Sequence, residues 1–258
     1  MISGKRVIAA MLTALMAVTF TASTAVSVYA TGVTAAENAQ TIDAQSTDAQ
    51  ALTPEEQKAQ ELQQVYDMPV ESNGYKDWPQ GPGTYGEAGI VMEVGTGAIL
   101  YAKNIDAHEY PASITKVLTA LVALENGQLT DNVTFSHDSV AFLQRGDSSV
   151  GLKEGNVITL DQAMHAMLLA SANEAAYAIG ESVGVNAGHD YNWFVEQMNS
   201  RCKELGGENS HFANTNGLHD PNHYTCARDM ALIGRELFKH PEFFQIVQTL
   251  NYTIPASE

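Results

Sequence analysis

The sequence is short of positive charge. Its 258 residues carry 13 Lys and Arg against 30 Asp and Glu, which gives a formal net charge of −17 at pH 7. A chain this acidic lacks the basic face that meets the phosphates of nucleic acid or of anionic lipid. We therefore expect neither nucleic acid nor an electrostatically held membrane surface as a partner.

Cysteine is also scarce. The two cysteines, Cys202 and Cys226, lie outside any CxxC or Cys/His cluster, so at most one disulfide can form and its pairing stays open. His219 and His223 are four residues apart, but the proline between them places them in a loop and not on a metal-binding helix. The sequence therefore predicts no metal site and no cofactor.

The chain lacks an uninterrupted apolar run long enough to span a bilayer. Its most apolar stretch, residues 7–20, is followed by threonines and serines that dilute it. Lys5 and Arg6 precede this stretch and small residues extend to Ala30, which is the pattern of a secretory signal peptide. We predict a signal peptide over residues 1–30 and an exported, extracytoplasmic protein; an uncleaved anchor helix is the weaker alternative.

Residues 31 to about 52 are mostly small and polar, so they cannot bury enough apolar surface to fold, and we assign residues 31–77 to a linker. Inside it, Thr53 as N-cap, Pro54 at the first helical position and Glu56 as the partner in a capping box predict a short helix. Prolines and glycines then mark the start of a folded domain, which we assign to residues 78–258.

The apolar pattern of that domain begins as strands and continues as helices. Two apolar runs, 88–92 and 98–102, flank a glycine-rich turn and predict an antiparallel hairpin. A new strand is predicted from Leu250, so the order suits an α+β domain whose sheet closes late. Four helices are predicted. The first starts at Ile114 and the second at Leu160, after the N-cap Thr159. The third spans residues 191–205, and the fourth follows Thr225.

Ser113 and Lys116 form the first candidate site. They are three residues apart at a predicted helix start, so their side chains share one face. A serine hydroxyl needs a base to become a nucleophile, and a lysine can serve only when it is neutral, a state that burial favours. Ser-x-x-Lys is common by chance, and a solvated helical turn is the ordinary alternative. The strongly apolar helix that follows favours the chemical interpretation.

Ser171 and Asn173 form the second candidate site. They lie at a break after a buried helix, 58 residues beyond Ser113. If the backbone is extended there, the hydroxyl can relay a proton to a leaving amine and the amide can hold a substrate backbone. A helix-capping turn is the ordinary alternative for Ser171-Ala-Asn173 taken alone.

Together the two motifs resemble the penicillin-binding proteins and serine β-lactamases, whose signature is S-x-x-K, S-x-N and K-[TS]-G. Residues from about 80 to 258 are similar to one branch, the low-molecular-weight, serine-type D-alanyl-D-alanine carboxypeptidases. This resemblance implies a β-lactamase/DD-peptidase-like α+β fold, with an antiparallel sheet flanked by helices and a helical subdomain. The similar stretches are Thr96–Asn104, Pro111–Lys116, Ser171–Ala176, Glu204–Gly206, His211–His219 and Ala227–Met230.

The resemblance implies a role for each candidate residue. Ser113 would be the acylated nucleophile and Lys116 its base, while Ser171 would complete proton transfer and Asn173 would bind the substrate. The implied substrate is a peptidoglycan stem peptide ending in D-Ala-D-Ala, which would lose its terminal D-alanine before water releases the acyl-enzyme. β-Lactams would acylate the same serine as covalent inhibitors.

One motif of the resemblance is absent. No Lys-[Thr/Ser]-Gly follows Ser171, because Lys203 and Lys239 precede Glu and His, and Lys153-Glu-Gly155 comes too early. We expect a C-terminally truncated sequence whose sheet is incomplete and which is inactive alone. Membrane attachment is then expected only through a missing C-terminal segment.

Two other functions stay open. A class A-like β-lactamase would need a glutamate in an E-x-x-L-N context to activate water, and Glu196, Glu204 and Glu208 lie outside such a context. A non-catalytic penicillin-recognising sensor, or a wall-binding remnant, would be acylated without turning over. Release of D-alanine from a peptide ending in D-Ala-D-Ala would distinguish a carboxypeptidase from both alternatives.

Overall fold

The structure, a computed structural model, describes residues 52–254. These residues belong to one compact unit that begins at Ala51. The signal peptide predicted over residues 1–30 and the first part of the predicted linker lie outside the described residues. No helix between residues 52 and 254 has the length and apolar character needed to cross a bilayer.

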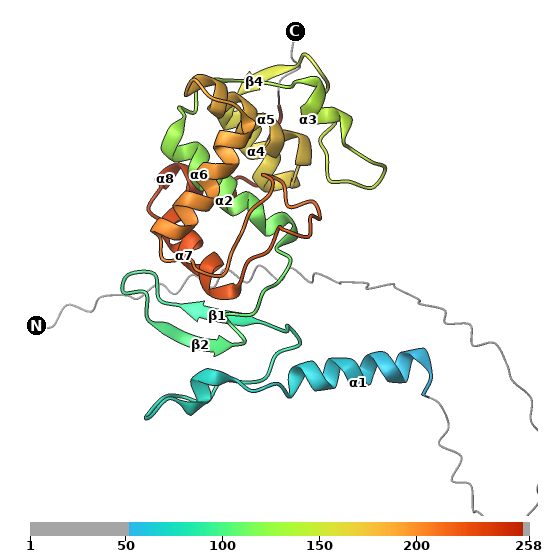
Figure 1. Ribbon diagram of the computed structural model, residues 1–258, viewed down its shortest axis with the longest axis vertical. Helices are drawn as coiled ribbons and strands as arrows, with labels where there is room; N and C mark the ends of the chain where they lie inside the picture. The colour runs from blue at the N-terminus through green and yellow to red at the C-terminus, as the bar shows by residue number, and fades with distance from the viewer. Residues whose placement is uncertain (1–51, 255–258) are drawn as a thin grey trace, which may run out of the picture. The chain divides into compact units, whose positions relative to one another are not determined.

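Helices make up most of the regular structure in the described residues (Figure 1). The helices are α1 Pro54–Tyr66, α2 Thr115–Asn126, α3 His137–Ala141, α4 Leu160–Ala170, α5 Asn173–Asn186, α6 Tyr191–Glu204, α7 Ala227–Leu237 and α8 Pro241–Val247, with short 3₁₀ segments η1 Glu71–Gly74 and η2 Ala112–Ile114. The strands are β1 Gly89–Met92, β2 Ile99–Lys103, β3 Asn132–Thr134 and β4 Val157–Thr159.

The strands form two separate antiparallel pairs. In the first pair Gly89 lies opposite Lys103, and the register shifts once between Val91 and Met92, so the predicted hairpin is confirmed. In the second pair, β3 and β4, Asn132 lies opposite Thr159. The second pair was not predicted, because three-residue strands are too short to show an alternating pattern.

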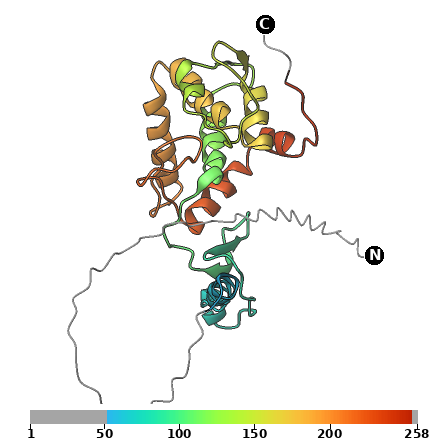
Figure 2. The same ribbon diagram turned by 90° about the vertical axis from the view of Figure 1, so that its right-hand side faces the viewer.

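Helix α2 lies at the centre of the helical part. It packs against α4, α5, α6 and α7, and Figures 1 and 2 show it passing between them. Leu118 and Leu121 are fully buried on the face that the apolar period predicts, and Val122 is nearly so. Burial of each such side chain stabilises the fold by roughly 1.5–3 kcal/mol. The packing of these side chains therefore holds the start of α2 in a defined position relative to the core.

Two predicted helix starts are confirmed in atomic detail. At α4 the Thr159 hydroxyl accepts a hydrogen bond from the Gln162 amide (3.2 Å), and the Gln162 side chain accepts one from the Thr159 amide (2.9 Å). The same reciprocal pair joins Thr53 and Glu56 at α1. Residues before Trp78 also contact the hairpin, since the Ser72 hydroxyl accepts a hydrogen bond from the Ala102 amide.

Helices α5 and α8 were missed by the sequence analysis. Helix α5 is rich in alanine and glycine and is buried around most of its circumference, so it lacks the apolar stripe that marks a surface helix. Helix α8 is only seven residues long and begins at Pro241, a residue type that also marks the ends of helices. A proline is well suited to a first helical turn.

The strand predicted from Leu250 is wrong. Leu250 is 94% exposed, and residues 251–254 have no regular structure. A strand needs a hydrogen-bonding partner strand, and none lies beside this segment within residues 52–254. Tyr252 instead stacks on His165 of α4, with ring centroids 3.7 Å apart, and hydrogen-bonds Asp161.

Candidate functional site

Ser113 lies in the 3₁₀ turn η2, immediately before α2, and its side chain is exposed. The preceding Ala112 has φ +48°, a left-handed conformation that costs a non-glycine residue about 1 kcal/mol. Lys116 is the second residue of α2 and is only 2% exposed. Its Nζ is 3.2 Å from Ser113 Oγ, so a buried amine faces an exposed hydroxyl.

The loop of residues 211–219 holds the turn at Ala112 in place. Gly217 in this loop has φ +83°, and a Cβ atom there would lie 1.8 Å from the Ala112 carbonyl oxygen. Only glycine allows so close an approach. The loop is joined to α2 as well, because the Thr119 hydroxyl donates to the Thr215 carbonyl at 2.7 Å.

Ser171 and Asn173 reach the same point from α4 and α5. Ser171 ends α4 in a left-handed conformation (φ 55°, ψ 29°), and Asn173 begins α5. The extended backbone that the sequence analysis required is therefore replaced by a left-handed turn. Ser171 Oγ lies 3.0 Å from Ser113 Oγ, and Asn173 Oδ1 lies 2.8 Å from Lys116 Nζ. The structure thus brings the four predicted residues together.

Lys116 joins the two motifs. Its Nζ donates to Asn173 Oδ1 and, at 2.7 Å, to the backbone carbonyl of Asn216. A neutral amine has two N–H bonds and one lone pair. When two N–H bonds point at these carbonyls, the lone pair of the neutral form is left facing Ser113. The contact with Asn216 was not predicted, because a backbone carbonyl leaves no mark in a sequence.

Burial lowers the pKa of Lys116 from its usual 10.5 to about 8, and the nearby Glu174 carboxylate opposes that shift. The sequence analysis did not foresee Glu174. With a pKa near 8, about a tenth of the lysine is neutral at pH 7, against less than a thousandth for an exposed lysine. Lys116 can therefore act as a base in an appreciable fraction of the molecules at neutral pH.

Glu174 follows Asn173 and is fully buried. Its Oε1 accepts hydrogen bonds from the Ser149 hydroxyl (2.7 Å) and the amides of Val150 (2.8 Å) and Gly151 (3.2 Å). Its Oε2 is buried without a hydrogen-bond partner in the described residues. Glu174 thus fixes the loop at 149–151 next to the site and places a negative charge near Lys116.

His223 belongs to the histidine pair that the sequence analysis judged not to bind metal. It is 2% exposed; its Nδ1 accepts from the Ala213 amide at 3.0 Å, so Nε2 carries the proton and donates to the Thr115 hydroxyl at 2.8 Å. Burial lowers its pKa from 6.5 to about 4, which keeps the ring neutral at pH 7. Within residues 52–254 no three or more His, Cys, Asp or Glu side chains form a metal-binding group.

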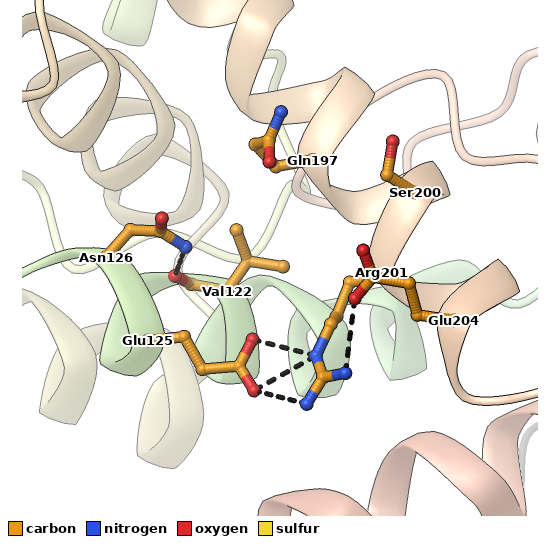
Figure 3. A pocket seen from close by; sticks show the side chains of 7 residues that line it. All are labelled: Val122, Glu125, Asn126, Gln197, Ser200, Arg201 and Glu204. Carbon is orange, nitrogen blue, oxygen red and sulfur yellow. Dashed lines mark hydrogen bonds and ion pairs between the residues drawn. The ribbon is translucent and has the colours of Figure 1, made fainter.

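A separate pocket of about 280 Å³ lies between α2 and α6 (Figure 3). Figure 3 shows Arg201 between Glu125 and Glu204, at 2.8 Å and 3.3 Å, so its charge is already neutralised. Glu125 lies nine residues beyond Lys116, or about 14 Å along the helix. This pocket is therefore distinct from the serine–lysine site.

The geometry brings a buried lysine amine and two serine hydroxyls together at a helix start. Residues 79–256 match the Peptidase_S11 family, described as D-alanyl-D-alanine carboxypeptidase. The match covers more than half of the chain, and the protein belongs to this family.

Two curated relatives show the extent of the similarity. The D-alanyl-D-alanine carboxypeptidase DacA of Haemophilus influenzae is 34% identical over 170 residues, which cover 64% of this chain and 42% of the relative. DacF of Bacillus subtilis, with the same description, is 33% identical over 168 residues, or 63% of this chain and 41% of the relative. The chain thus spans about two fifths of the length of these relatives.

Solved structures place the fold among DD-peptidases. A D-alanyl-D-alanine carboxypeptidase from Mycobacterium tuberculosis superposes with a TM-score of 0.61 at 28% identity, covering 73% of this chain and 68% of that one. The Streptomyces K15 DD-transpeptidase gives a TM-score of 0.57 at 29% identity, over 62% and 63% of the two chains. These similarities confirm the β-lactamase/DD-peptidase-like fold class predicted from the sequence.

Proposed function

We propose that the full-length protein is a serine-type D-Ala-D-Ala carboxypeptidase. It removes the terminal D-alanine from peptidoglycan stem peptides through an acyl-enzyme on Ser113, and β-lactams acylate the same residue. Such a substrate lies outside the cytoplasm, which agrees with export by the signal peptide proposed over residues 1–30. The observation that carries the proposal is the contact of Lys116 Nζ with Ser113 Oγ in a buried, pKa-lowering environment.

The proposed first step is acylation. Neutral Lys116 takes the Ser113 proton while Ser113 Oγ bonds to the carbonyl carbon of the scissile peptide, giving a tetrahedral intermediate. Its collapse breaks the C–N bond, and the departing amine of D-alanine takes a proton from the Lys116 ammonium through the Ser171 hydroxyl. Ser171 Oγ lies 3.0 Å from Ser113 Oγ, which supports this relay. Water then cleaves the ester and frees the serine.

Asn173 has a divided role in this proposal. Its Oδ1 is occupied by Lys116, and its Nδ2 has no hydrogen-bond partner within residues 52–254 although the residue is only 5% exposed. Nδ2 is not among the atoms that are shielded from solvent, so it is free to donate to a ligand. We propose that Nδ2 donates to a backbone carbonyl of the substrate peptide.

The test uses the full-length protein, a fluorescent penicillin and a peptide ending in D-Ala-D-Ala. We expect covalent labelling at Ser113 and release of D-alanine, both abolished by Ser113→Ala and retained by Ser200→Ala, which changes an exposed serine of α6. Labelling that persists in Ser113→Ala would refute the assignment of the nucleophile.

The fate of the acyl-enzyme separates the proposed activity from its rivals. A carboxypeptidase releases D-alanine in water without an added amine, whereas a transpeptidase needs an acceptor amine. A sensor is labelled by penicillin but releases no D-alanine, and a β-lactamase turns over nitrocefin rapidly. D-Alanine release that depends on an added amine would replace hydrolysis by transpeptidation as the proposed reaction.

A further inference from the structure

A lysine outside the serine–lysine site is completely buried. Lys103, the last residue of β2, is 0% exposed and forms no ion pair with an acid within residues 52–254. Its Nζ donates instead to two backbone carbonyls, that of Val65 in the last turn of α1 and, at 2.7 Å, that of Thr84. Burial lowers the pKa of this amine, because its charge has only neutral partners.

The two carbonyls belong to the two ends of one segment, residues 65–84, which we call the strap. Lys103 therefore closes the strap into a loop by binding both of its ends. The ends also cross closely, because a Cβ atom at Gly83 would lie 2.4 Å from the Tyr66 carbonyl oxygen. Only glycine allows so close an approach of two backbone segments.

The strap lies along β2, on the side of the strand opposite β1 (Figures 1 and 2). Three polar backbone groups on β2 or just past its end bond to side chains of the strap. The Ala102 amide donates to Ser72 Oγ at 3.2 Å, the Asn104 amide donates to Glu71 Oε1 at 3.0 Å, and the Leu100 carbonyl accepts from Trp78 Nε1 at 2.8 Å. Side chains thus take the place of a neighbouring strand at this edge.

The opposite edge of the hairpin has no such cover. Among the residues that the structure describes, no side chain hydrogen-bonds to the backbone of β1. A strand edge with unpaired N–H and C=O groups is a template on which another strand can pair. Since β2 is the same in every copy of the chain, two uncovered β2 strands could pair antiparallel about a twofold axis and join two hairpins into one sheet.

We propose that the strap closes the outer edge of β2 against pairing with a second copy of this chain. Lys103 keeps the strap in place by holding both of its ends. Any further strand, from the same chain or from another, then has only β1 to pair with. Most of the strap precedes residues 79–256, the stretch that matches the family, and the proposal does not depend on the proposed carboxypeptidase function.

The experiment forces the ends of the strap apart in the full-length protein with Gly83→Ala. At low protein concentration we expect the Ala102 and Asn104 amide protons to exchange with solvent at least about tenfold faster than in the wild type, as measured by NMR. In sedimentation the variant should form a dimer at concentrations where the wild type is monomeric, and exchange of the same two amides should slow again in the dimer. Gly74→Ala is the matched control inside the strap, since nothing lies within 4 Å of its Cβ position, and it should behave as the wild type.

Two further variants act on the hydrogen bonds of the strap. Lys103→Met removes the amine but keeps most of the side-chain volume, and it should open the strap in the same way as Gly83→Ala. Ser72→Ala removes a single hydroxyl and should speed exchange of the Ala102 amide alone, by several-fold. If urea unfolding shows that Gly83→Ala does not fold, these two variants provide the test.

Three outcomes would overturn the proposal. Faster exchange without a dimer would show that the open edge of β2 does not pair. Unchanged exchange in Gly83→Ala, Lys103→Met and Ser72→Ala would show that the strap is not what covers this edge. A dimer in which the Ala102 and Asn104 amides still exchange fast would show that the copies associate through another surface.

Discussion

At the scale of single residues, the chemistry depends on how Lys116 is surrounded. Three oxygen atoms meet its amine, from Ser113, Asn173 and Asn216, and nearly all water is excluded. Burial alone would favour the neutral amine strongly, and Glu174 limits that effect. The two opposing influences leave Lys116 with a pKa of about 8.

Replacing Glu174 by Gln tests this balance. Loss of the negative charge should lower the pKa of Lys116 further, so the rising limb of the kcat/KM profile for acylation should move to lower pH by roughly one unit. The direction follows because only the neutral lysine accepts the serine proton, and a lower pKa makes it neutral at lower pH. Rates of penicillin acylation between pH 5 and 10 would measure the shift.

Glu196→Gln is the matched control for Glu174→Gln. Glu196 is exposed on α6, so this variant should keep the wild-type profile. A Glu174→Gln enzyme with a lower rate but an unshifted limb would indicate that Glu174 only holds the loop at 149–151. A shift to higher pH would contradict the electrostatic argument.

The four motif residues could be predicted because Ser113-x-x-Lys116 and Ser171-x-Asn173, taken together, resemble the signature of a known family. Glu174, Asn216 and His223 were missed for physical reasons. The function of Asn216 uses its backbone carbonyl, and those of Glu174 and His223 depend on burial, which a single sequence does not display. The only signal was the place of these residues within or next to stretches that resembled the family.

At the scale of elements, the loop of residues 211–219 and the start of α2 form one assembly. Gly217 is its closest contact, so Gly217→Ala should push the loop away from Ala112 and move the Asn216 carbonyl off Lys116. We expect a loss of about 2 kcal/mol or more in the free energy of unfolding, and an acylation rate reduced at least about tenfold. Urea unfolding and penicillin labelling rates would measure the two effects.

Gly234→Ala in α7 is the control for Gly217→Ala. No atom lies within 4 Å of the position that its Cβ would take, and alanine favours a helix by up to about 1 kcal/mol over glycine. This variant should be neutral or slightly more stable and fully active. Equal behaviour of the two variants would refute the steric argument.

His223 makes the attachment of the same loop sensitive to pH. Its folded pKa of about 4 lies below its usual 6.5, so its contribution to stability is complete above about pH 6.5 and is lost as pH falls towards 4. His223→Gln should be less stable at pH 7.5, but its stability should fall less steeply between pH 6.5 and 4.5. Urea unfolding at four pH values would resolve the slopes, and His189→Gln, at an exposed position, should keep the wild-type slope.

At the scale of the whole molecule, both cysteines are free and buried in the described structure. Burial is the main cause that raises the pKa of each thiol, Cys202 and Cys226, to about 11. We expect no reaction of the native protein with a thiol reagent at pH 8, and reaction of two thiols per chain after denaturation without reductant. Finding no reactive thiols after denaturation would show that the two cysteines form a disulfide in the native protein.

The β-lactamase/DD-peptidase-like fold class was predicted from the resemblance to the family, whereas the prediction of single elements depended on their periodic patterns. The hairpin, α2, α4, α6 and α7 carry periodic patterns and were found. Helix α5 was missed because it is apolar on nearly every side, and the strand at Leu250 was wrongly assigned because the sequence does not show whether a partner strand is beside it.

The hydrogen bonds of Lys116 have a consequence for the timing of folding. They join residues separated by 57 and 100 positions along the chain, to Asn173 and Asn216. Contacts between residues so far apart in the sequence form late in folding, because closing a large loop lowers the entropy of the chain before the contacts can stabilise it. A nascent or unfolded chain therefore holds a solvated lysine and an inert serine. Ser113 gains its base only when three segments that are distant in the sequence have come together. Partly folded chains therefore have no reactive serine.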